Sequence, residues 1–333
     1  MTSDVVMIPT VAGEVRSDEL GVTLMHEHIF ILSPELEQNY PEGWQEEERV
    51  ADAITKLQAA KNGGVDTVVD LTVLGLGRYI PRIQRIAEQV DINIIVATGA
   101  YITTALPLQF MFQDPAGPLG KREVLIDMFE QDAAKGISDT GVRAAIIKCA
   151  TDHAGLTPDV ERVLRAAARV QRGTNLPIFT HTEAETRRGL DQLRIFAAEG
   201  VDPQSVIIGH SGDTGDLDYL RELLAAGSYL GMDRFGLYNI LDYETRLDTV
   251  ANLCTEGYSS RLLLSHDTSC YFRWDAELRS LAPQWHYTHL IEDVLPDLRR
   301  RGVSQGQIDE MMVVNPRRIF ESNHLCVARE ESS

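Results

Sequence analysis

Short apolar runs, rich in β-branched residues, alternate with longer helical patterns along the whole chain. Strands that alternate with helices in this way form βα units and a parallel sheet. Eight strands close a (β/α)8 barrel, and we predict this TIM-barrel fold. The eight runs cover residues 22–28, 67–71, 92–98, 143–148, 177–181, 205–210, 228–233 and 262–267.

The segments between the runs have the spacing of amphipathic helices. Residues 47–61 carry apolar side chains on one helical face, at Val50, Ile54, Leu57 and Ala60. Thr157 followed by Pro158 is typical of a helix start, because threonine caps the first turn and proline fits the first helical position. The alternative fold is a doubly wound open sheet, which the missing glycine-rich phosphate loop after the first run disfavours.

We predict one catalytic domain over residues 1–333, because 333 residues fit one barrel of ~250 residues with long loops. Residues 1–20 precede the first barrel strand as a hairpin or cap. Residues 105–120 are rich in Pro and Gly and are predicted to form a long loop. Another long segment, residues 271–287, follows the eighth strand.

Composition and charge narrow the class of protein. The 44% hydrophobic and 24% charged fractions are typical of a soluble globular protein. The net charge of -19, from 31 Lys+Arg against 50 Asp+Glu, disfavours nucleic acids and anionic membranes as partners. It favours neutral or weakly charged substrates. Four cysteines without a pairing pattern, no signal-peptide pattern and no apolar run of ~20 residues lead us to expect a cytoplasmic protein.

Candidate metal ligands or charged residues end five of the eight predicted strands. In this kind of barrel the chemistry is located at the C-terminal ends of the strands. These residues are therefore expected to meet at one rim: His26 and His28 on the first strand, Lys148 on the fourth, His181 on the fifth, His210 on the sixth and Asp267 on the eighth.

The spacing of these residues suits a pair of metal ions. His26 and His28 share one face of an extended segment and can bind the same ion, and His181 with His210 can bind a second. Such nitrogen and oxygen ligands suit zinc, iron, cobalt or manganese. Each residue alone could be a structural histidine, a salt-bridged lysine or a helix cap, but their joint position at five strand ends favours a binuclear site.

Lys148 follows four apolar residues, so its side chain leaves a buried strand. Burial and nearby positive charge both lower the pKa of a lysine. A neutral amine reacts with carbon dioxide to give a carbamate, an anion with two oxygens that can bridge two metals. Carboxylation of Lys148 is a hypothesis from this reasoning.

With these residues assembled, the chain resembles the phosphotriesterase family of the amidohydrolase superfamily from about residue 21 to residue 320. The matching stretches are GVTLMHEH at 21–28, IK at 147–148, FTH at 179–181, IIGHSGD at 207–213, LSHD at 264–267 and NP at 315–316. The resemblance implies that His26, His28 and Asp267 hold the more buried metal, and that His181 and His210 hold the more exposed one. It further implies that carboxylated Lys148 and a hydroxide bridge the two, and that the protein is a homodimer.

Within that family the chain looks most similar to the phosphotriesterase-like lactonases. Tyr101 matches a tyrosine that those enzymes place beside the metals, and the pair Asp233-Arg234 matches theirs, where organophosphate hydrolases differ. The segment through Trp274 matches their lid over an acyl-chain channel. The alternatives are a core aromatic for Tyr101, a structural ion pair for Arg234 and loop packing for Trp274.

The resemblance implies hydrolysis of lactones, above all the N-acyl homoserine lactones of bacterial quorum sensing, by a metal-bridged hydroxide. Tyr101 would donate a hydrogen bond to the oxyanion, Arg234 would order the loops or polarise the substrate, and Asp267 would carry the proton to the leaving alkoxide. Trp274 and Tyr271 would line the acyl channel. Weak phosphotriester hydrolysis is expected as a side activity.

Two other functions stay open at this point. Phosphotriester hydrolysis could be the main activity, or the barrel could bind a ligand without catalysis, although none of the six ligands is missing. His266 should point away from Asp267, because neighbours on a strand face opposite sides. His153, His286, His289 and His324 have no assigned role.

Overall fold

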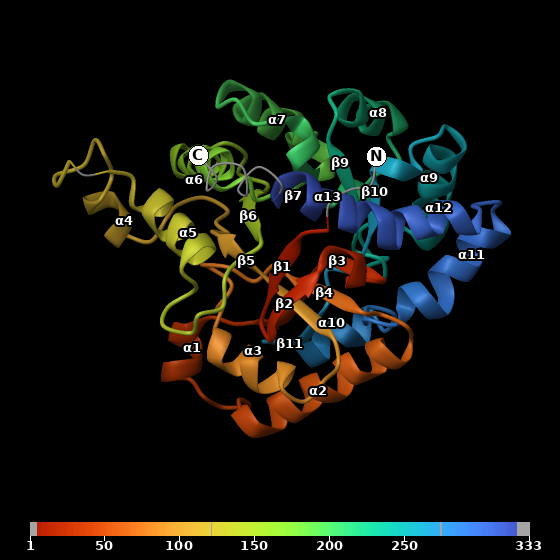
Figure 1. Ribbon diagram of the computed structural model, residues 1–333, viewed down its shortest axis with the longest axis horizontal. Helices are drawn as coiled ribbons and strands as arrows, with labels where there is room; N and C mark the ends of the chain where they lie inside the picture. The colour runs from red at the N-terminus through yellow and green to blue at the C-terminus, as the bar shows by residue number, and fades with distance from the viewer. Residues whose placement is uncertain (1–4, 121, 274, 325–333) are drawn as a thin grey trace.

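The computed structural model describes residues 5–120, 122–273 and 275–324. Within these residues, one sheet of nine parallel strands curls around the centre of the molecule (Figure 1) in the order β10-β9-β8-β7-β6-β5-β4-β3-β11. The strands are β3 (Thr23–Ile31), β4 (Thr67–Asp70), β5 (Asn93–Gly99), β6 (Ile146–Thr151), β7 (Ile178–Thr182), β8 (Val206–Ile208), β9 (Tyr229–Met232), β10 (Leu262–Leu264) and β11 (Ser269–Phe272).

The eighth barrel strand is divided into two pieces, β10 and β11, and the two together close the barrel. β10 pairs with β9, and β11, which begins five residues after β10 ends, pairs with β3 at the other edge of the sheet. The residues between the two halves form a bend that contains Asp267. Each of the eight predicted runs overlaps one barrel strand, and the predicted (β/α)8 barrel is confirmed, with a break in the last run.

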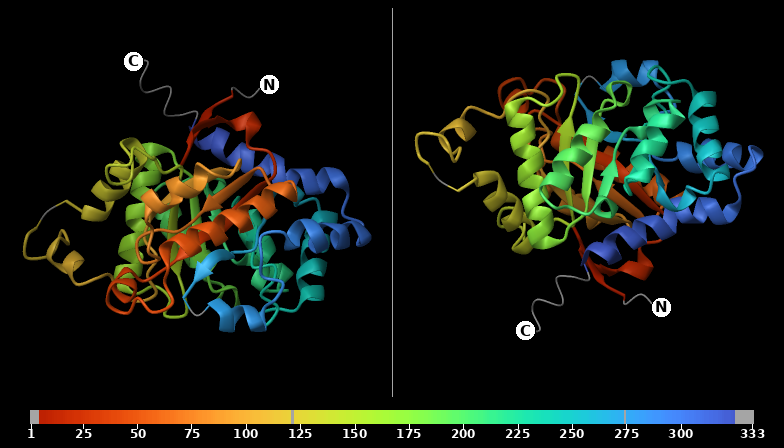
Figure 2. Two further views of the ribbon diagram at one scale, coloured as in Figure 1. Left: turned by 90° about the horizontal axis from the view of Figure 1, so that it is seen from below. Right: turned by 90° about the horizontal axis from the view of Figure 1, so that it is seen from above.

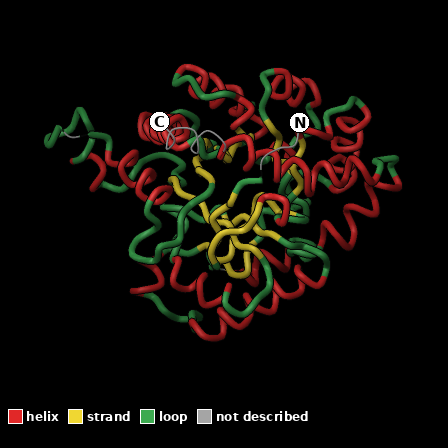
Figure 3. Tube along the Cα trace, in the orientation of Figure 1, coloured by secondary structure: helices red, strands yellow, loops and turns green. Residues whose placement is uncertain are grey.

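Helices surround the strands on the outside, as the red and yellow segments of Figure 3 show. The helix α2 turns Val50, Leu57 and Ala60 into the core, as predicted, while Ile54 is half-buried. The Thr157 side chain caps α6 by accepting the Val160 N–H at 3.2 Å. The helices between barrel strands are α1 (Pro34–Asn39), α2 (Glu46–Asn62), α3 (Ile80–Ala87), α4 (Gln109–Phe112), α5 (Val124–Ala134), α6 (Pro158–Thr174), α7 (Arg188–Ala198), α8 (Leu217–Ala225) and α9 (Tyr243–Thr255).

One end of the barrel is plugged by the two ends of the described chain. The antiparallel strands β1 (Met7–Thr10) and β2 (Gly13–Arg16) lead to β3. Ile8 and Leu20 from this segment pack with Ile319 and Phe320 of the last helix against the side chains inside the barrel. The N-terminal ends of the strands are thereby covered, and their C-terminal ends stay available for a site.

A set of short helical pieces follows the barrel: α10 (Asp275–Leu281), the π-helical turn η6 (Leu290–Val294), α11 (Leu295–Arg300), α12 (Gln305–Asp309), the π-helical turn η7 (Glu310–Val314) and α13 (Asn315–His324). Residues 271–287 thus contain the end of β11 and the helix α10. The segment 105–120 contains only the short helix α4 and projects away from the barrel in both views of Figure 2. None of the described helices has the length and apolar character that crossing a membrane requires.

Candidate metal centre

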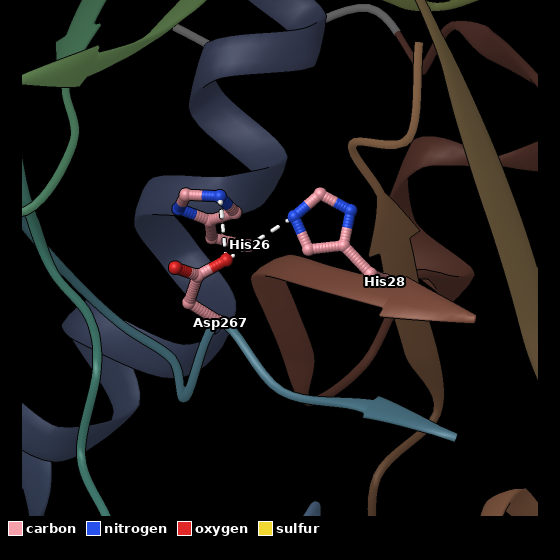
Figure 4. Close-up of side chains that lie close together, drawn as sticks. All are labelled: His26, His28 and Asp267. Carbon is pink, nitrogen blue, oxygen red and sulfur yellow. Dashed lines mark ion pairs between the residues drawn. The ribbon is translucent and has the colours of Figure 1, made fainter. Parts of the chain in front are cut away.

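His26 and His28 point from β3 into the open end of the barrel. Both rings converge on the carboxylate of Asp267 (Figure 4), and their Nε2 atoms lie 3.2 and 3.1 Å from Asp267 Oδ1. All three residues are almost wholly buried. Nδ1 of His26 contacts Asp233 and Nδ1 of His28 contacts Thr72 Oγ1, so with the proton on Nδ1 each ring turns a free electron pair on Nε2 toward Asp267. The three facing atoms can then bind one cation.

The second pair of histidines meets in the same way. His181 at the end of β7 and His210 just after β8 bring Nδ1 and Nε2 to 2.7 Å from one another. Lys148 on β6 lies between the two groups, with its Nζ 3.0 Å from His26 Nε2, and His210 Nε2 lies 3.8 Å from Asp267 Oδ2. The structure thus brings all six predicted ligands together, from five strands.

Backbone strain is concentrated at this site. His210, Arg234 and Asp267 have φ values of 57°, 64° and 54°, in the left-handed region. Non-glycine residues there cost of order 1–2 kcal/mol each. The Glu27 carboxylate holds the bend at Asp267 by accepting the backbone N–H groups of His266 and Thr268, each at 2.9 Å, and its Oε1 lies 2.8 Å from His266 Nδ1.

Asp233 is a site residue to which the sequence analysis gave no role of its own. Its Oδ2 lies 2.6 Å from His26 Nδ1, and its Oδ1 lies 2.8 Å from His210 Nδ1. A carboxylate on Nδ1 keeps the proton there and leaves Nε2 free to bind a metal. Asp233 therefore orients one histidine of each pair. It is better suited to hold these ligand histidines in place than to bind a metal ion itself. Its position at the end of the seventh run was the signal available in the sequence.

The protonation states match what a metal requires. Burial, with help from Lys148, lowers the pKa of His26 to about 4, and burial also lowers the pKa values of His210 and His181. Burial lowers the pKa of Lys148 to about 8. Burial acts to raise the pKa of Asp267, but the neighbouring histidines and Arg234 hold it well below its ordinary value. Neutral imidazoles and an ionised carboxylate are the metal-binding forms, so the residues present fit a binuclear metal site.

Arg234 ties the centre to a chain of ion pairs. Its Nε donates to Asp267 Oδ2 at 3.0 Å and its Nη1 donates to Asp213 Oδ2 at 2.9 Å. Asp213 in turn accepts a hydrogen bond of 2.7 Å from the buried Arg246. The guanidinium is thus fixed against the one carboxylate that also faces His26 and His28.

Tyr101 lies beside the second histidine pair. Its ring packs edge-on against His181, with 5.1 Å between ring centroids, and its hydroxyl donates to Asp152 at 3.4 Å. Burial and the Asp152 charge raise the pKa of Tyr101, so the phenol stays protonated and can donate. Both residues line a cavity of about 440 Å³, which His181, Arg234, Asp213, Glu183, Glu185 and Ile240 also line.

The remaining predicted residues have other positions. Tyr271 packs against Trp44, with 5.3 Å between ring centroids, and under the guanidinium of Arg49, so the structure does not bring it to this cavity. Trp274 lies outside the described residues, and the cavity wall that is described is mainly polar rather than the expected apolar channel.

The other histidines have structural contacts. As expected, His266 points away from Asp267, and its Nε2 accepts the Leu290 N–H at 3.0 Å. The side chain of His153 is 91% exposed. His289 contacts the Tyr238 hydroxyl and Asp293, and His286 lies 3.1 Å from Thr288 Oγ1. His324 ends α13.

Known proteins with similar sequences share this fold and family. The profile of the Phosphotriesterase family matches residues 6–320. A phosphotriesterase homology protein of Mycobacterium tuberculosis is 54% identical over 317 residues, 94% of this chain and 97% of the relative. An aryldialkylphosphatase of Saccharolobus solfataricus is 37% identical over 318 residues, 94% of this chain and 99% of the relative. The solved structure of the phosphotriesterase from M. tuberculosis superimposes with a TM-score of 0.93 at 52% identity, covering 95% of this chain and 98% of that one.

Proposed function

The chain belongs to the phosphotriesterase family and is a metal-dependent hydrolase, and from this premise we propose that it opens lactones, above all N-acyl homoserine lactones. Hydrolysis of phosphotriesters is a weaker side activity in this proposal. The observation that carries it is the contact of Arg234 with Asp267, at 3.0 Å.

In the proposed holoenzyme, His26, His28 and Asp267 hold the more buried ion and His181 and His210 the more exposed one. Lys148 would react with carbon dioxide through its neutral amine, with release of one proton, and the resulting carbamate would supply oxygen ligands to the metal site. Two bound divalent ions supply Lewis acidity and a water-derived nucleophile at neutral pH. Zinc is our first choice, and iron, cobalt and manganese also accept this donor set.

Asp267 accepts the proton of the attacking water in this mechanism, because it is the ionised carboxylate that faces both histidines of β3. Arg234 cannot take that proton onward, since a guanidinium stays protonated in proteins. Because the pKa of Asp267 is held well below its ordinary value, Asp267 gives this proton up readily, and the leaving group receives it. A lactone leaves as an aliphatic alkoxide that needs a proton, whereas an aryl oxide leaves without one, so this arrangement favours the lactone.

Charge around the cavity points to a neutral substrate. Asp152, Glu183, Glu185 and Asp213 line it together with the single guanidinium of Arg234. A neutral lactone enters without electrostatic cost, and its ring-opened product carries a carboxylate that this wall repels. In this proposal the Tyr101 hydroxyl, whose ring packs against His181, turns from Asp152 to donate to the developing oxyanion.

Phosphotriester hydrolysis as the main activity is the second candidate. A phosphotriester is neutral as well, so the charge argument does not separate the two substrates. The 37% identity to a protein named aryldialkylphosphatase favours this candidate.

A paired assay on metal-replete enzyme separates the candidates. It compares kcat/KM for a long-chain N-acyl homoserine lactone with kcat/KM for an aryl dialkyl phosphotriester, each with and without chelator. We expect the lactone to exceed the phosphotriester by orders of magnitude and chelation to abolish both activities. A higher value for the phosphotriester would leave the metal site intact but would overturn the lactone assignment.

We also propose a homodimer, with the projecting segment 105–120 as part of the contact. Leu108, Met111, Phe112 and Leu119 are 64%, 59%, 51% and 56% exposed there. So many large apolar side chains on one projecting segment are typical of a surface that another protein covers.

A further inference from the structure

A second cavity lies at the opposite end of the barrel from the metal centre. Its volume is about 640 Å³. Its walls are the end of α6, the turns η3 (Pro203–Ser205) and η5 (Ser259–Arg261) that precede β8 and β10, and the last helix α13. All of these belong to the N-terminal end of the strands, so this cavity is separate from the site where hydrolysis takes place.

Three arginines line this cavity: Arg172 from α6, Arg261 from η5 and Arg318 from α13. Each guanidinium is held by uncharged groups. Arg172 lies against Gly200 and donates to the Glu199 carbonyl at 3.2 Å. Arg261 lies over the ring of Tyr229 and donates to the Gln204 amide oxygen at 3.1 Å, and Arg318 donates to the Ser260 carbonyl at 3.4 Å.

The charges of these three arginines are not neutralised. Within residues 5–120, 122–273 and 275–324, the hydrogen bonds of the three go to uncharged groups and none of them forms an ion pair, although the chain carries 50 acidic residues against 31 basic ones. A guanidinium has five N–H donors, and the contacts above use only one or two of them. Three positively charged side chains with spare donors therefore line one cavity of a strongly acidic protein, with Arg172 and Arg318 exposed to solvent.

The rest of the wall is polar and small. Gln171, Asn175, Ser205, Ser322 and Asn323 contribute amide and hydroxyl groups, and Asp202 is the single acid among the described lining residues. Such a wall does not favour an apolar ligand. Arginine forks match the paired oxygens of phosphate, and the volume exceeds that of one phosphate group, within the range of pockets that hold small molecules.

We propose that this cavity is a binding site for a small phosphate-bearing molecule with a hydroxylated body. Arg172, Arg261 and Arg318 bind the phosphate oxygens, and the amides, hydroxyls and Asp202 bind the hydroxyl groups. Because the site joins α13 to the turns before β8 and β10, a bound ligand stabilises the folded chain against unfolding.

The test uses metal-replete, full-length enzyme with inorganic phosphate and ribose 5-phosphate as probes. Calorimetric titration gives the Kd of each probe, and thermal unfolding gives the change in Tm. Sodium chloride at matched ionic strength corrects for screening of the net negative charge. We expect saturable binding and a rise in Tm beyond that in chloride, larger for ribose 5-phosphate. Equal effects of the two probes would reassign the ligand to inorganic phosphate, and no effect beyond chloride would overturn the site.

Variants separate this cavity from the metal centre, which could also bind phosphate. In Arg172→Gln/Arg318→Gln we expect the Kd to rise roughly tenfold for each guanidinium removed. Ser322→Glu, at an exposed lining position, should also abolish binding by placing a carboxylate among the arginines. Arg299→Gln is the matched control, because Arg299 is exposed and bonds only to Gln305 among the described residues. Binding that survives unchanged in the first two variants would place the phosphate elsewhere and refute the proposal.

Discussion

Asp233→Asn is the substitution that most directly tests how the metal centre is built. The Asp233 carboxylate contacts Nδ1 of His26 at 2.6 Å, Nδ1 of His210 at 2.8 Å and the backbone N–H of His210 at 2.9 Å. An asparagine keeps one oxygen and presents an N–H₂ group to one of the two rings. That ring must then move its proton from Nδ1 to Nε2, the atom that faces the metal position.

The expected loss can be worked from these contacts. A buried hydrogen bond to a charged group contributes about 1.5–3 kcal/mol, and loss of the partner of a metal-binding histidine lowers metal affinity about 10–100-fold. Because Asp233 contacts one histidine of each pair, the affinity for both ions should fall, whereas loss of His28 alone should weaken only the more buried one. The substitution should therefore lower the metal content from two ions per chain towards none at limiting metal.

The assay measures bound metal by mass spectrometry across a series of buffered free-metal concentrations, together with lactone kcat/KM at each point. Asp132→Asn is the matched control, since Asp132 is a buried acid that bonds to Arg78 and Thr98 outside the barrel. It should reduce stability and leave metal affinity unchanged. If Asp233→Asn binds both ions as tightly as the wild type, the assigned role of Asp233 is wrong.

Three further predictions concern the substrate, pH and assembly. Tyr101→Phe should lower kcat/KM for lactones roughly tenfold or more while lowering it less for phosphotriesters, because in the proposed mechanism the hydroxyl donates to the lactone oxyanion; equal losses would argue against that role. Burial lowers the pKa of His266 to about 3, so the unfolded chain binds a proton between pH 6.5 and about 3 that the folded chain excludes. Stability should fall with decreasing pH across that window, and His266→Gln should show a smaller fall in urea unfolding of the metal-free protein. If the proposed homodimer forms, Phe112→Asp should convert it into a folded monomer in analytical ultracentrifugation, and an unchanged dimer would place the contact elsewhere.

The barrel could be predicted from sequence because its strands are buried on both faces. The centres of the predicted runs, such as residues 94–97 and 144–147, are apolar throughout and buried, and such stretches stand out from amphipathic helices. The last run could not be predicted in full, since the bend at Asp267 depends on three hydrogen bonds to Glu27, a residue 240 positions away. Likewise, the predicted long segments after the third and eighth strands gave no hint of the helices α4 and α10 within them.

The candidate site, like the fold, was predicted only in part from the sequence. Histidines and charged residues at strand ends are visible in the sequence, because the barrel brings all strand ends to one rim whatever the details of packing. Tyr271 shows the limit: its position in the chain suggested the substrate channel, but its side chain packs against Trp44 and Arg49. The role of Asp233 could not be predicted for the same reason. Only the directions of the side chains in the folded chain show that its carboxylate lies between two imidazole rings.

The sequence by itself determined the eight apolar runs that become strands, the six candidate metal ligands at their ends, and a net charge of -19. Only the tertiary structure decided how those groups are oriented and which carboxylate contacts the histidines at Nδ1. It also revealed the arginine-lined cavity, whose three guanidinium groups come from positions 172, 261 and 318. The physical reason is that composition and local pattern act over a few residues, whereas hydrogen-bond partners and unpaired charges are set by contacts between segments far apart in the chain.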